Sequence, residues 1–148
     1  MIGDQDEPVE LTPHVGVGPL LLGMSESEAR AILGSPRSSR RTRKGEIEHS
    51  WRGVRICFAL NGAAEEISLA PPARPVYRGH ELFAEHRLIQ LFSQEDPEPK
   101  GGFGIVVFLG LGIAISGAET GEPDQPSVTL FSPGRWDNLS PPLRPIGH

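Results

Sequence analysis

The spacing of apolar residues changes between a helical and an alternating pattern along the chain, and each change predicts an element. Over residues 25–34 the apolar side chains recur at helical spacing. Ser25 and Glu28 form a capping box at the start of this run, while Gly34 and Pro36 are typical of a helix end. The sequence therefore predicts a short helix over residues 25–34.

Alternating patterns follow this helix and predict antiparallel strands. Asn61-Gly62 is typical of a two-residue hairpin loop between two of them. The segment 37–44, in front of the first of these strands, is rich in bases and has no apolar period, so we expect a loop there. The expected elements are an extended entry at 15–22 before the helix, and strands at 46–51, 54–59 and 65–69 after it.

The second half of the chain repeats this layout. An extended segment at 76–78 precedes an amphipathic run that predicts a helix at roughly 84–94. A long apolar pattern over 103–116, interrupted by glycines, predicts either two strands or one strand with a bulge, and 126–131 predicts a last strand. The shared order of extended entry, short helix and strands leaves a duplication open as an interpretation.

The grouping of the strands predicts the fold class. Strands that are bunched together, rather than alternating with helices, favour an antiparallel sheet covered on one face. We expect an α+β fold, with an antiparallel β-sheet of about six to seven strands, two short helices packed on one face, and two related α-β-β halves as one interpretation. The 148 residues suit one domain, and a hydrophobic share of 37% is typical of a folded chain. The expected division is a flexible acidic leader at 1–13, a single domain at 14–137 and a Pro-rich tail at 138–148.

Residues 17–36 resemble a recurrent bacterial pattern, in which Gly-Met-Ser/Thr is followed by a short helix and Leu-Gly-x-Pro. This pattern opens domains of the BamE-like outer-membrane assembly lipoproteins and of the β-lactamase-inhibitor proteins, and similar openings occur in immunity-type proteins of secreted toxins. The resemblance implies a small helix-plus-antiparallel-sheet unit whose sheet surface binds a protein. It carries over no individual functional residue, and the chain shows neither the lipoprotein signal of the first group nor the cysteine pairs of the second.

Charge is distributed unevenly along the chain. The formal net charge is -5 and the pI is about 5.5, which argues against a general binder of nucleic acid or of an anionic membrane. Residues 37–55, however, carry seven bases and two acids, a balance of +5, so the remainder carries about -10. A solvated loop is one interpretation of the basic segment, an electrostatic contact with an acidic protein partner is the sharper one, and contact with RNA or DNA is the third.

The candidate partner-binding residues come from this basic segment and from two tryptophans. Trp136 stands next to Arg135, and this pair of residue types is common at binding hot spots. The alternative for Trp136 is a half-buried ring that packs the tail onto the sheet. The predicted partner-binding residues are Arg40, Arg41, Arg43, Trp51 and Trp136.

Residues that could support catalysis or metal binding lack the spacing that such sites need. The five histidines show no metal-ligand spacing, and the serines lack a G-x-S-x-G elbow. Glu65 and Glu66 are adjacent in a predicted strand, so we expect them to point to opposite faces. Cys57, the one cysteine, lies in an apolar run that predicts a buried, inert thiol. We therefore expect no catalytic residue, no metal and no cofactor.

The functional prediction follows from these observations together. The start of the chain is acidic where a secretory signal would be basic, and the apolar stretch 103–115 is too short to span a bilayer, so we expect a cytoplasmic protein. We expect a non-enzymatic protein-binding module, an immunity-type inhibitor that occludes a toxin or enzyme. Two alternatives stay open, a small-ligand-binding or enzyme domain whose pocket is not visible in the sequence, and a structural, oligomerising subunit.

Overall fold

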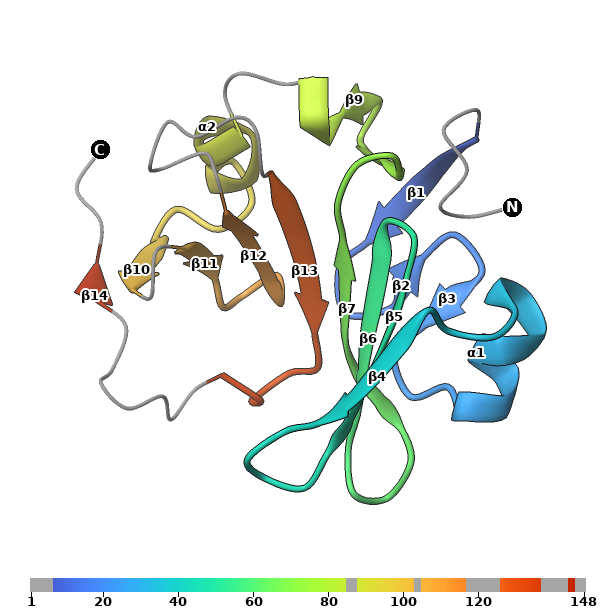
Figure 1. Ribbon diagram of the computed structural model, residues 1–148. Helices are drawn as coiled ribbons and strands as arrows, with labels where there is room; N and C mark the ends of the chain where they lie inside the picture. Colours follow the sequence, from blue (N-terminus) through green and yellow to red (C-terminus); the bar gives the residue numbers. More distant parts are fainter. Residues whose placement is uncertain (1–6, 85–87, 103–104, 117–125, 137–143, 146–148) are drawn as a thin grey trace.

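The chain folds into two β-sheets with short helices at their margins (Figure 1). A computed structural model describes residues 7–84, 88–102, 105–116, 126–136 and 144–145. Within this part of the chain the larger sheet has nine strands, and every neighbouring pair in it runs antiparallel. From one edge to the other, its strands are β14 (Arg144–Pro145), β10 (Lys100–Gly102), β11 (Ile105–Phe108), β12 (Ile113–Ser116), β13 (Ser127–Phe131), β7 (Ala64–Leu69), β6 (Val54–Phe58), β5 (Ile47–Trp51) and β4 (Ser38–Arg41).

Two four-stranded meanders make up most of the larger sheet. The strands β4 to β7 follow one another both in sequence and in space, and so do β10 to β13. The two meanders meet where β7 pairs with β13, which places Ile67 opposite Leu130. A short helix precedes each meander, so the element order of the two halves is similar.

The smaller sheet is built from short strands that come before each helix. Its centre is the pair β1 and β8, which run parallel. The predicted loose leader at 1–13 does not hold for residues 8–12, because these form β1 and turn Val9 and Leu11 into the core. The strands of this sheet, in spatial order, are β3 (Leu20–Leu21), β2 (Gly16–Val17), β1 (Pro8–Thr12), β8 (Arg74–Tyr77) and β9 (His80–Glu81).

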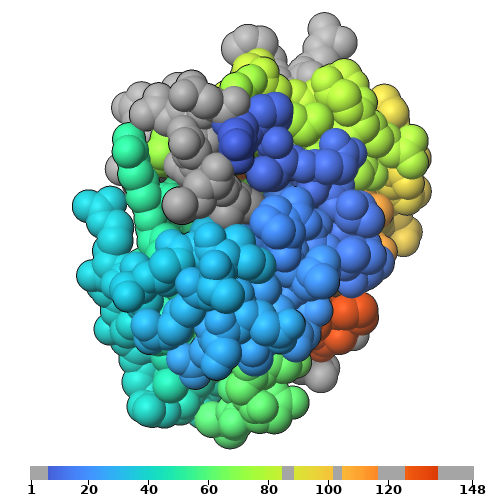
Figure 2. Space-filling view, turned by 90° about the vertical axis from the view of Figure 1, so that its right-hand side faces the viewer, coloured from blue at the N-terminus to red at the C-terminus, as the bar shows by residue number. Residues whose placement is uncertain are grey.

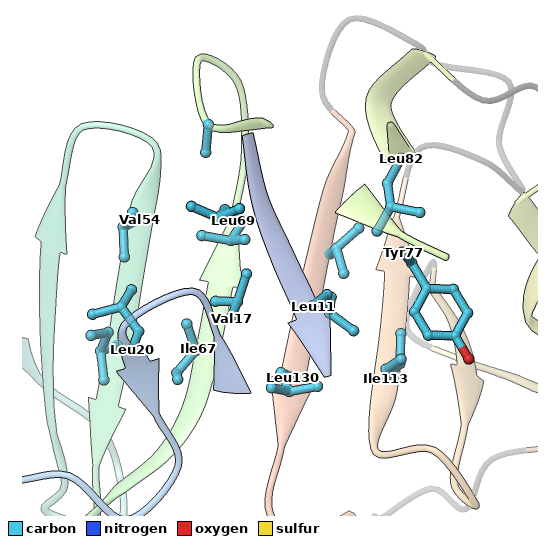
Figure 3. Close-up of a cluster of buried hydrophobic side chains, with 14 of the residues drawn as sticks. Leu11, Val17, Leu20, Val54, Ile67, Leu69, Tyr77, Leu82, Ile113 and Leu130 are labelled. Carbon is cyan, nitrogen blue, oxygen red and sulfur yellow. The ribbon is translucent and has the colours of Figure 1, made fainter. Parts of the chain in front are cut away.

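The main core lies between the two sheets. Figure 3 shows Leu11 and Val17 of the smaller sheet close to Ile67 and Leu130 of the larger one, and all four side chains are buried. Burial of apolar side chains of this size stabilises a fold by about 2 kcal/mol each, so this interface is the main source of stability. The expectation of one sheet covered by two helices is therefore wrong in its layers: a second sheet covers the inner face.

The first helix confirms the local prediction. α1 (Glu26–Leu33) begins with the capping box, in which Ser25 Oγ accepts from the backbone N–H of Glu28 at 3.2 Å. The carboxylate of Glu28 in turn accepts from the backbone N–H of Ser25 at 3.0 Å. Gly34 ends the helix with a φ of 83°. Only Ala29 of the helix is fully buried, so α1 packs at the margin of the core.

The second helix is shorter than predicted. A 3-10 turn, η1 (Leu82–Ala84), and α2 (Leu88–Ser93) occupy the region where we expect a helix at 84–94, and residues 85–87 lie outside the described part. Phe92 is fully buried and its ring packs on those of Tyr77 and Phe108, at centroid distances of 5.0 and 5.4 Å. α2 therefore closes one end of the core.

The predicted loop at 37–44 is wrong over Ser38–Arg41, which form the edge strand β4. All four residues of β4 are exposed, so the strand has no buried face and its sequence has no apolar alternation. Backbone pairing with β5 holds the segment extended instead, with Arg40 opposite Glu48. A pattern based on burial cannot detect such a strand.

The two hairpins that the sequence predicts have different outcomes. The apolar pattern 103–116 gives the two strands β11 and β12, which is one of the two predicted alternatives. The hairpin at Asn61-Gly62 has a three-residue loop, because the backbone N–H of Ala59 bonds to the carbonyl of Ala63 and Gly62 takes the left-handed conformation with a φ of 89°. Leu60 thus becomes a loop residue.

Candidate partner-binding surface

The β4–β5 hairpin carries the three predicted arginines, and all three are exposed. Arg40 is paired, with its Nε 2.7 Å from Glu48 Oε1. Arg41 donates from Nη1 to the carbonyl oxygen of Gly45 at 2.8 Å. Within the described residues Arg43 and Lys44 are exposed and have no carboxylate within ion-pair distance. The two bases at the tip are therefore the ones available to a partner.

The turn that carries these two bases is held in one conformation. The backbone N–H of Thr42 donates to the carbonyl of Glu46 at 2.8 Å, and that of Gly45 donates to the carbonyl of Thr42 at 3.0 Å. Thr42 Oγ1 also accepts from the backbone N–H of Glu46 at 3.2 Å. Gly45 has a φ of 85°, which this turn requires and a glycine allows. A partner meets preorganised side-chain positions, which lowers the entropy cost of binding.

An exposed leucine lies beside this basic turn. Leu60, at the tip of the β6–β7 hairpin, is 77% exposed. A Cβ placed on Gly45 would lie 3.5 Å from Leu60 Cδ2, so the two hairpin tips are in contact. Figures 1 and 2 both show the tips side by side at the lower end of the molecule, the β4–β5 tip in teal and the β6–β7 tip in green. We call Arg41, Arg43, Lys44 and Leu60 the hairpin-tip surface.

The base of the β4–β5 turn is fixed by an arginine from the other end of the chain. Arg135 Nη2 lies 2.7 Å from Glu46 Oε1, and its Nε lies 2.6 Å from Glu66 Oε2. A third carboxylate, that of Glu65, lies 3.3 Å from Nη1. The hydrogen bond from Arg135 lowers the pKa of Glu46, and the bond to Glu46 raises the pKa of Arg135. We call Arg135, Glu46, Glu65 and Glu66 the Arg135 cluster.

The prediction that Glu65 and Glu66 point to opposite faces is wrong, because β7 contains a β-bulge. Cys57 pairs with Glu66, while the next residue, Phe58, pairs with Ala64, so Glu65 is an extra residue in the strand. The bulge breaks the strict alternation and lets both carboxylates reach the same guanidinium. The sequence carries no signal for this feature.

The cysteine lies under the Arg135 cluster. Cys57 is buried, as predicted, and its thiol donates to Glu46 Oε1 at 3.5 Å. Burial, followed by the nearby charges of Glu66 and Glu46, raises the pKa of the Cys57 thiol to about 12. Since the thiolate is the reactive form, this position favours an inert thiol.

The two predicted tryptophans are not part of the hairpin-tip surface. Trp51 is only 9% exposed, and its indole N–H donates to the carbonyl of Gly34 at 2.9 Å, so the ring belongs to the core. Trp136 is half-buried and stacks on Phe131 with a centroid distance of 4.5 Å. Its N–H donates to Glu66 at 3.0 Å. Both rings thus have structural partners, and of the predicted set only Arg41 and Arg43 belong to the hairpin-tip surface.

A buried histidine connects β4 to α1. Ser39 Oγ lies 2.6 Å from His49 Nδ1, and His49 Nε2 lies 2.7 Å from Glu26 Oε2. The order of groups is that of a Ser-His-acid triad, but Ser39 stands on the exposed edge strand and lines neither the cleft around Arg55 nor the one around Pro72 and Phe83. Both ring nitrogens have partners, so the chain of bonds satisfies a buried imidazole and fixes the edge strand.

A shallow polar cleft of about 520 Å³ lies on the outer face of the larger sheet. Ser68 bonds Thr129 beside it at 2.8 Å, and the guanidinium of Arg55 is its one charged group among the described lining residues. This is the feature that bears on small-ligand binding. Its described lining comprises Ser50, Trp51, Gly53, Val54, Arg55, Ser68, Leu69, Ala70, Pro71, Ser116, Pro126 and Ser127.

The described residues show neither a metal site nor a membrane-spanning helix. Among the described residues, no group of three or more His, Cys, Asp or Glu side chains could hold a metal ion. None of the helices in the described ranges combines the length and apolar character that crossing a membrane requires. No model of a known protein family, no curated protein and no solved structure matches this chain.

Proposed function

We propose that this chain is a non-enzymatic protein-binding module that docks on an acidic partner through the hairpin-tip surface. The observation that carries the proposal is the contact between a rigid turn bearing the unpaired bases Arg43 and Lys44 and the 77% exposed side chain of Leu60. An apolar side chain next to basic groups provides both a desolvated contact and electrostatic attraction.

The charge distribution favours a protein partner over nucleic acid. The basic segment belongs to a chain with a net charge of -5, so an extended polyanion would meet repulsion beyond the hairpin tips. Single-stranded nucleic acid also needs aromatic rings next to the bases, and Trp51, the aromatic residue nearest in sequence, is buried. A compact acidic site on a protein fits this surface better.

The role that we propose is that of a cytoplasmic, immunity-type inhibitor of a toxin or enzyme. The two hairpin tips extend beyond the body of the larger sheet in Figure 1, and such a projection suits insertion into a cleft. An acidic active-site cleft would be neutralised and blocked by the tips in one step. The resemblance of residues 17–36 to protein-binding bacterial domains is in line with this role.

The test is a comparison of two variants with equal net charge. Arg43→Glu/Lys44→Glu reverses the hairpin-tip bases, and Arg30→Glu/Arg52→Glu reverses two exposed bases elsewhere. Partners captured from native lysate are identified, and their association with each variant is measured at low and moderate salt. We expect the tip reversal to slow association by about tenfold or more, chiefly through the on-rate, and the control to change it little. Equal effects of the two variants would refute the proposal.

Small-ligand binding is a second candidate, and the outer-face cleft is the observation that favours it. Its serine hydroxyls and the Arg55 guanidinium suit a small anion such as a carboxylate. A screen of small anions by thermal shift, with Arg55→Gln as the control, tests this candidate. Ligands that stabilise the wild type and the variant equally would exclude the cleft as their site.

A further inference from the structure

Among the described strands, none lies beside the outer edge of β4, so backbone hydrogen-bonding groups of this strand have no strand partner there. Thr42 and Glu46 form a hydrogen-bonded pair, and in an antiparallel ladder such pairs alternate with non-bonded ones. The pairs Arg40–Glu48 and Ser38–Ser50 are therefore hydrogen-bonded, and the N–H and C=O groups of Ser39 and Arg41 point away from β5.

The same edge is kept extended by its side chains. Ser39 is tied to the buried His49 at 2.6 Å, and Arg40 is tied to Glu48 at 2.7 Å, so consecutive residues are anchored on opposite faces of the sheet. The backbone N–H of Arg37 also bonds to the carbonyl of Ser50 at 2.7 Å, which fixes the start of the strand. A strand held in this way is preorganised to accept another strand beside it.

We propose that the partner contributes an extended acidic segment that pairs with β4 as an additional strand of the larger sheet. This inference rests on the proposed function and specifies how the acidic partner binds. The backbone of the added segment would bond to Ser39 and Arg41, and its carboxylates would meet Arg37, Arg41 and Arg43. Backbone pairing supplies affinity in this mode of recognition, while the alternate side chains supply specificity.

The positive charge of β4 disfavours a second copy of this chain as the source of the strand that pairs with it. If two β4 strands paired with each other, the arginines at positions 37, 40 and 41 would crowd along one short ladder. Like charges placed opposite each other across a strand pair are destabilising. Bases on an edge strand thus prevent pairing between copies and at the same time select an acidic strand.

The experiment uses three synthetic peptides of about eight residues with alternating side chains, a length typical of a strand. The first alternates Glu and Thr, the second alternates Lys and Thr, and the third repeats the Glu peptide with every second backbone amide N-methylated. Binding to the full chain is followed by amide chemical shifts and by hydrogen exchange at Ser39 and Arg41. We expect the Glu peptide alone to bind and to slow exchange at both amides by about tenfold or more.

A pair of variants at one position separates backbone pairing from side-chain effects. Ser39→Pro removes the Ser39 hydroxyl and also the backbone N–H that points away from β5, so no backbone hydrogen bond to β5 is lost. Ser39→Ala removes the same hydroxyl but keeps this N–H. We expect the Ala variant to bind the Glu peptide as the wild type does and the Pro variant to bind about tenfold more weakly, the cost of about one hydrogen bond.

Two results would overturn strand addition. One is equal affinity for the N-methylated and the unmodified Glu peptides, and the other is absence of any change at Ser39 and Arg41 at millimolar Glu peptide. Either result leaves the charge-reversal test of the proposed function unaffected. Conversely, slowed hydrogen exchange at the amides of Ser39 and Arg41 would still support strand addition if reversal of Arg43 and Lys44 left association with the natural partner unchanged.

Discussion

Arg135 and Glu46 are 89 residues apart in the sequence, and their side chains form a two-point ion pair with Nη2–Oε1 and Nη1–Oε2 distances of 2.7 and 3.1 Å. Both side chains are 11% exposed. The pair joins the segment after β13 to the base of the β4–β5 turn. It therefore connects the C-terminal part of the described chain to the proposed binding surface.

Replacing Arg135 is expected to destabilise the fold strongly. Arg135→Gln would leave three carboxylates close together without their cation, and removal of one partner from a largely buried pair costs about 3 kcal/mol. Urea unfolding at pH 7 measures the loss. Arg40→Gln is the matched control, because the Arg40 side chain is 69% exposed and Glu48 keeps Arg55 at 3.9 Å, so its removal should leave the unfolding midpoint nearly unchanged. Equal losses in the two variants would contradict this account of the cluster.

Stability is expected to depend on pH through Glu46. Its pKa is lowered in the fold by the hydrogen bond from Arg135, relative to the ordinary value of 4.5. The stabilisation is fully present above pH 4.5 and is lost as pH falls through the lowered pKa, since the unfolded chain takes up the proton first. Unfolding free energies from pH 7 down to pH 3 should fall more steeply for the wild type than for Glu46→Gln. Parallel curves would contradict the assignment to Glu46.

Cys57 is expected to resist thiol reagents in the folded protein. With a pKa of about 12, only about one thiol in ten thousand is ionised at pH 8, and the sulfur is also buried. Modification of the native protein should therefore be slow and should become fast in urea. Arg135→Gln should accelerate modification in the absence of urea by favouring local opening. Rapid labelling of the native wild type would show that the sulfur is accessible.

Two glycines with similar backbone angles should respond differently to alanine. Gly112 has a φ of 69°, and a Cβ on it would lie 2.7 Å from the carbonyl oxygen of Phe131. Gly62 has a φ of 89°, but its Cβ would meet nothing within 4 Å. We expect Gly112→Ala to cost about 3 kcal/mol, from strain and the close contact, and Gly62→Ala to cost about 1 kcal/mol, from strain alone. Thermal unfolding of both variants provides the comparison.

Leu60 is expected to contribute to binding and not to stability. Leu60→Ser removes a side chain that is 77% exposed, so the unfolding midpoint should stay within error of the wild type. If the hairpin-tip surface docks on a partner, the same change should weaken association by about tenfold or more, as loss of a desolvated anchor does. Unchanged affinity would remove Leu60 from the proposed surface.

The sequence predicts elements well where local chemistry decides them. The capping box at Ser25 and Glu28 and the stop at Gly34 define α1 within one or two residues, because each signal acts within one helical turn. The strands β5, β6 and β7 are also close to the predicted ranges, since one side of each is buried and imposes alternation.

Features that depend on distant parts of the chain could not be predicted. The edge strand β4 has no buried face, and the bulge at Glu65 becomes visible only when β6 and β7 are paired. The Arg135 cluster joins residues that have no sequence relationship. Of the candidate site, the arginines were predictable from their charge, whereas Leu60 was not, because an apolar residue in a short loop has no periodic context.

The pairing of β7 with β13 has a consequence for synthesis on the ribosome. The strands β4 to β7 emerge early and can form a meander. β7 is then the edge strand of this meander until β13 has been synthesised and pairs with it. During this interval the apolar residues Ile67 and Leu69 stand on an open edge. A nascent chain in this state is prone to pair with neighbouring chains, so folding of this protein should depend on how quickly its second half is translated.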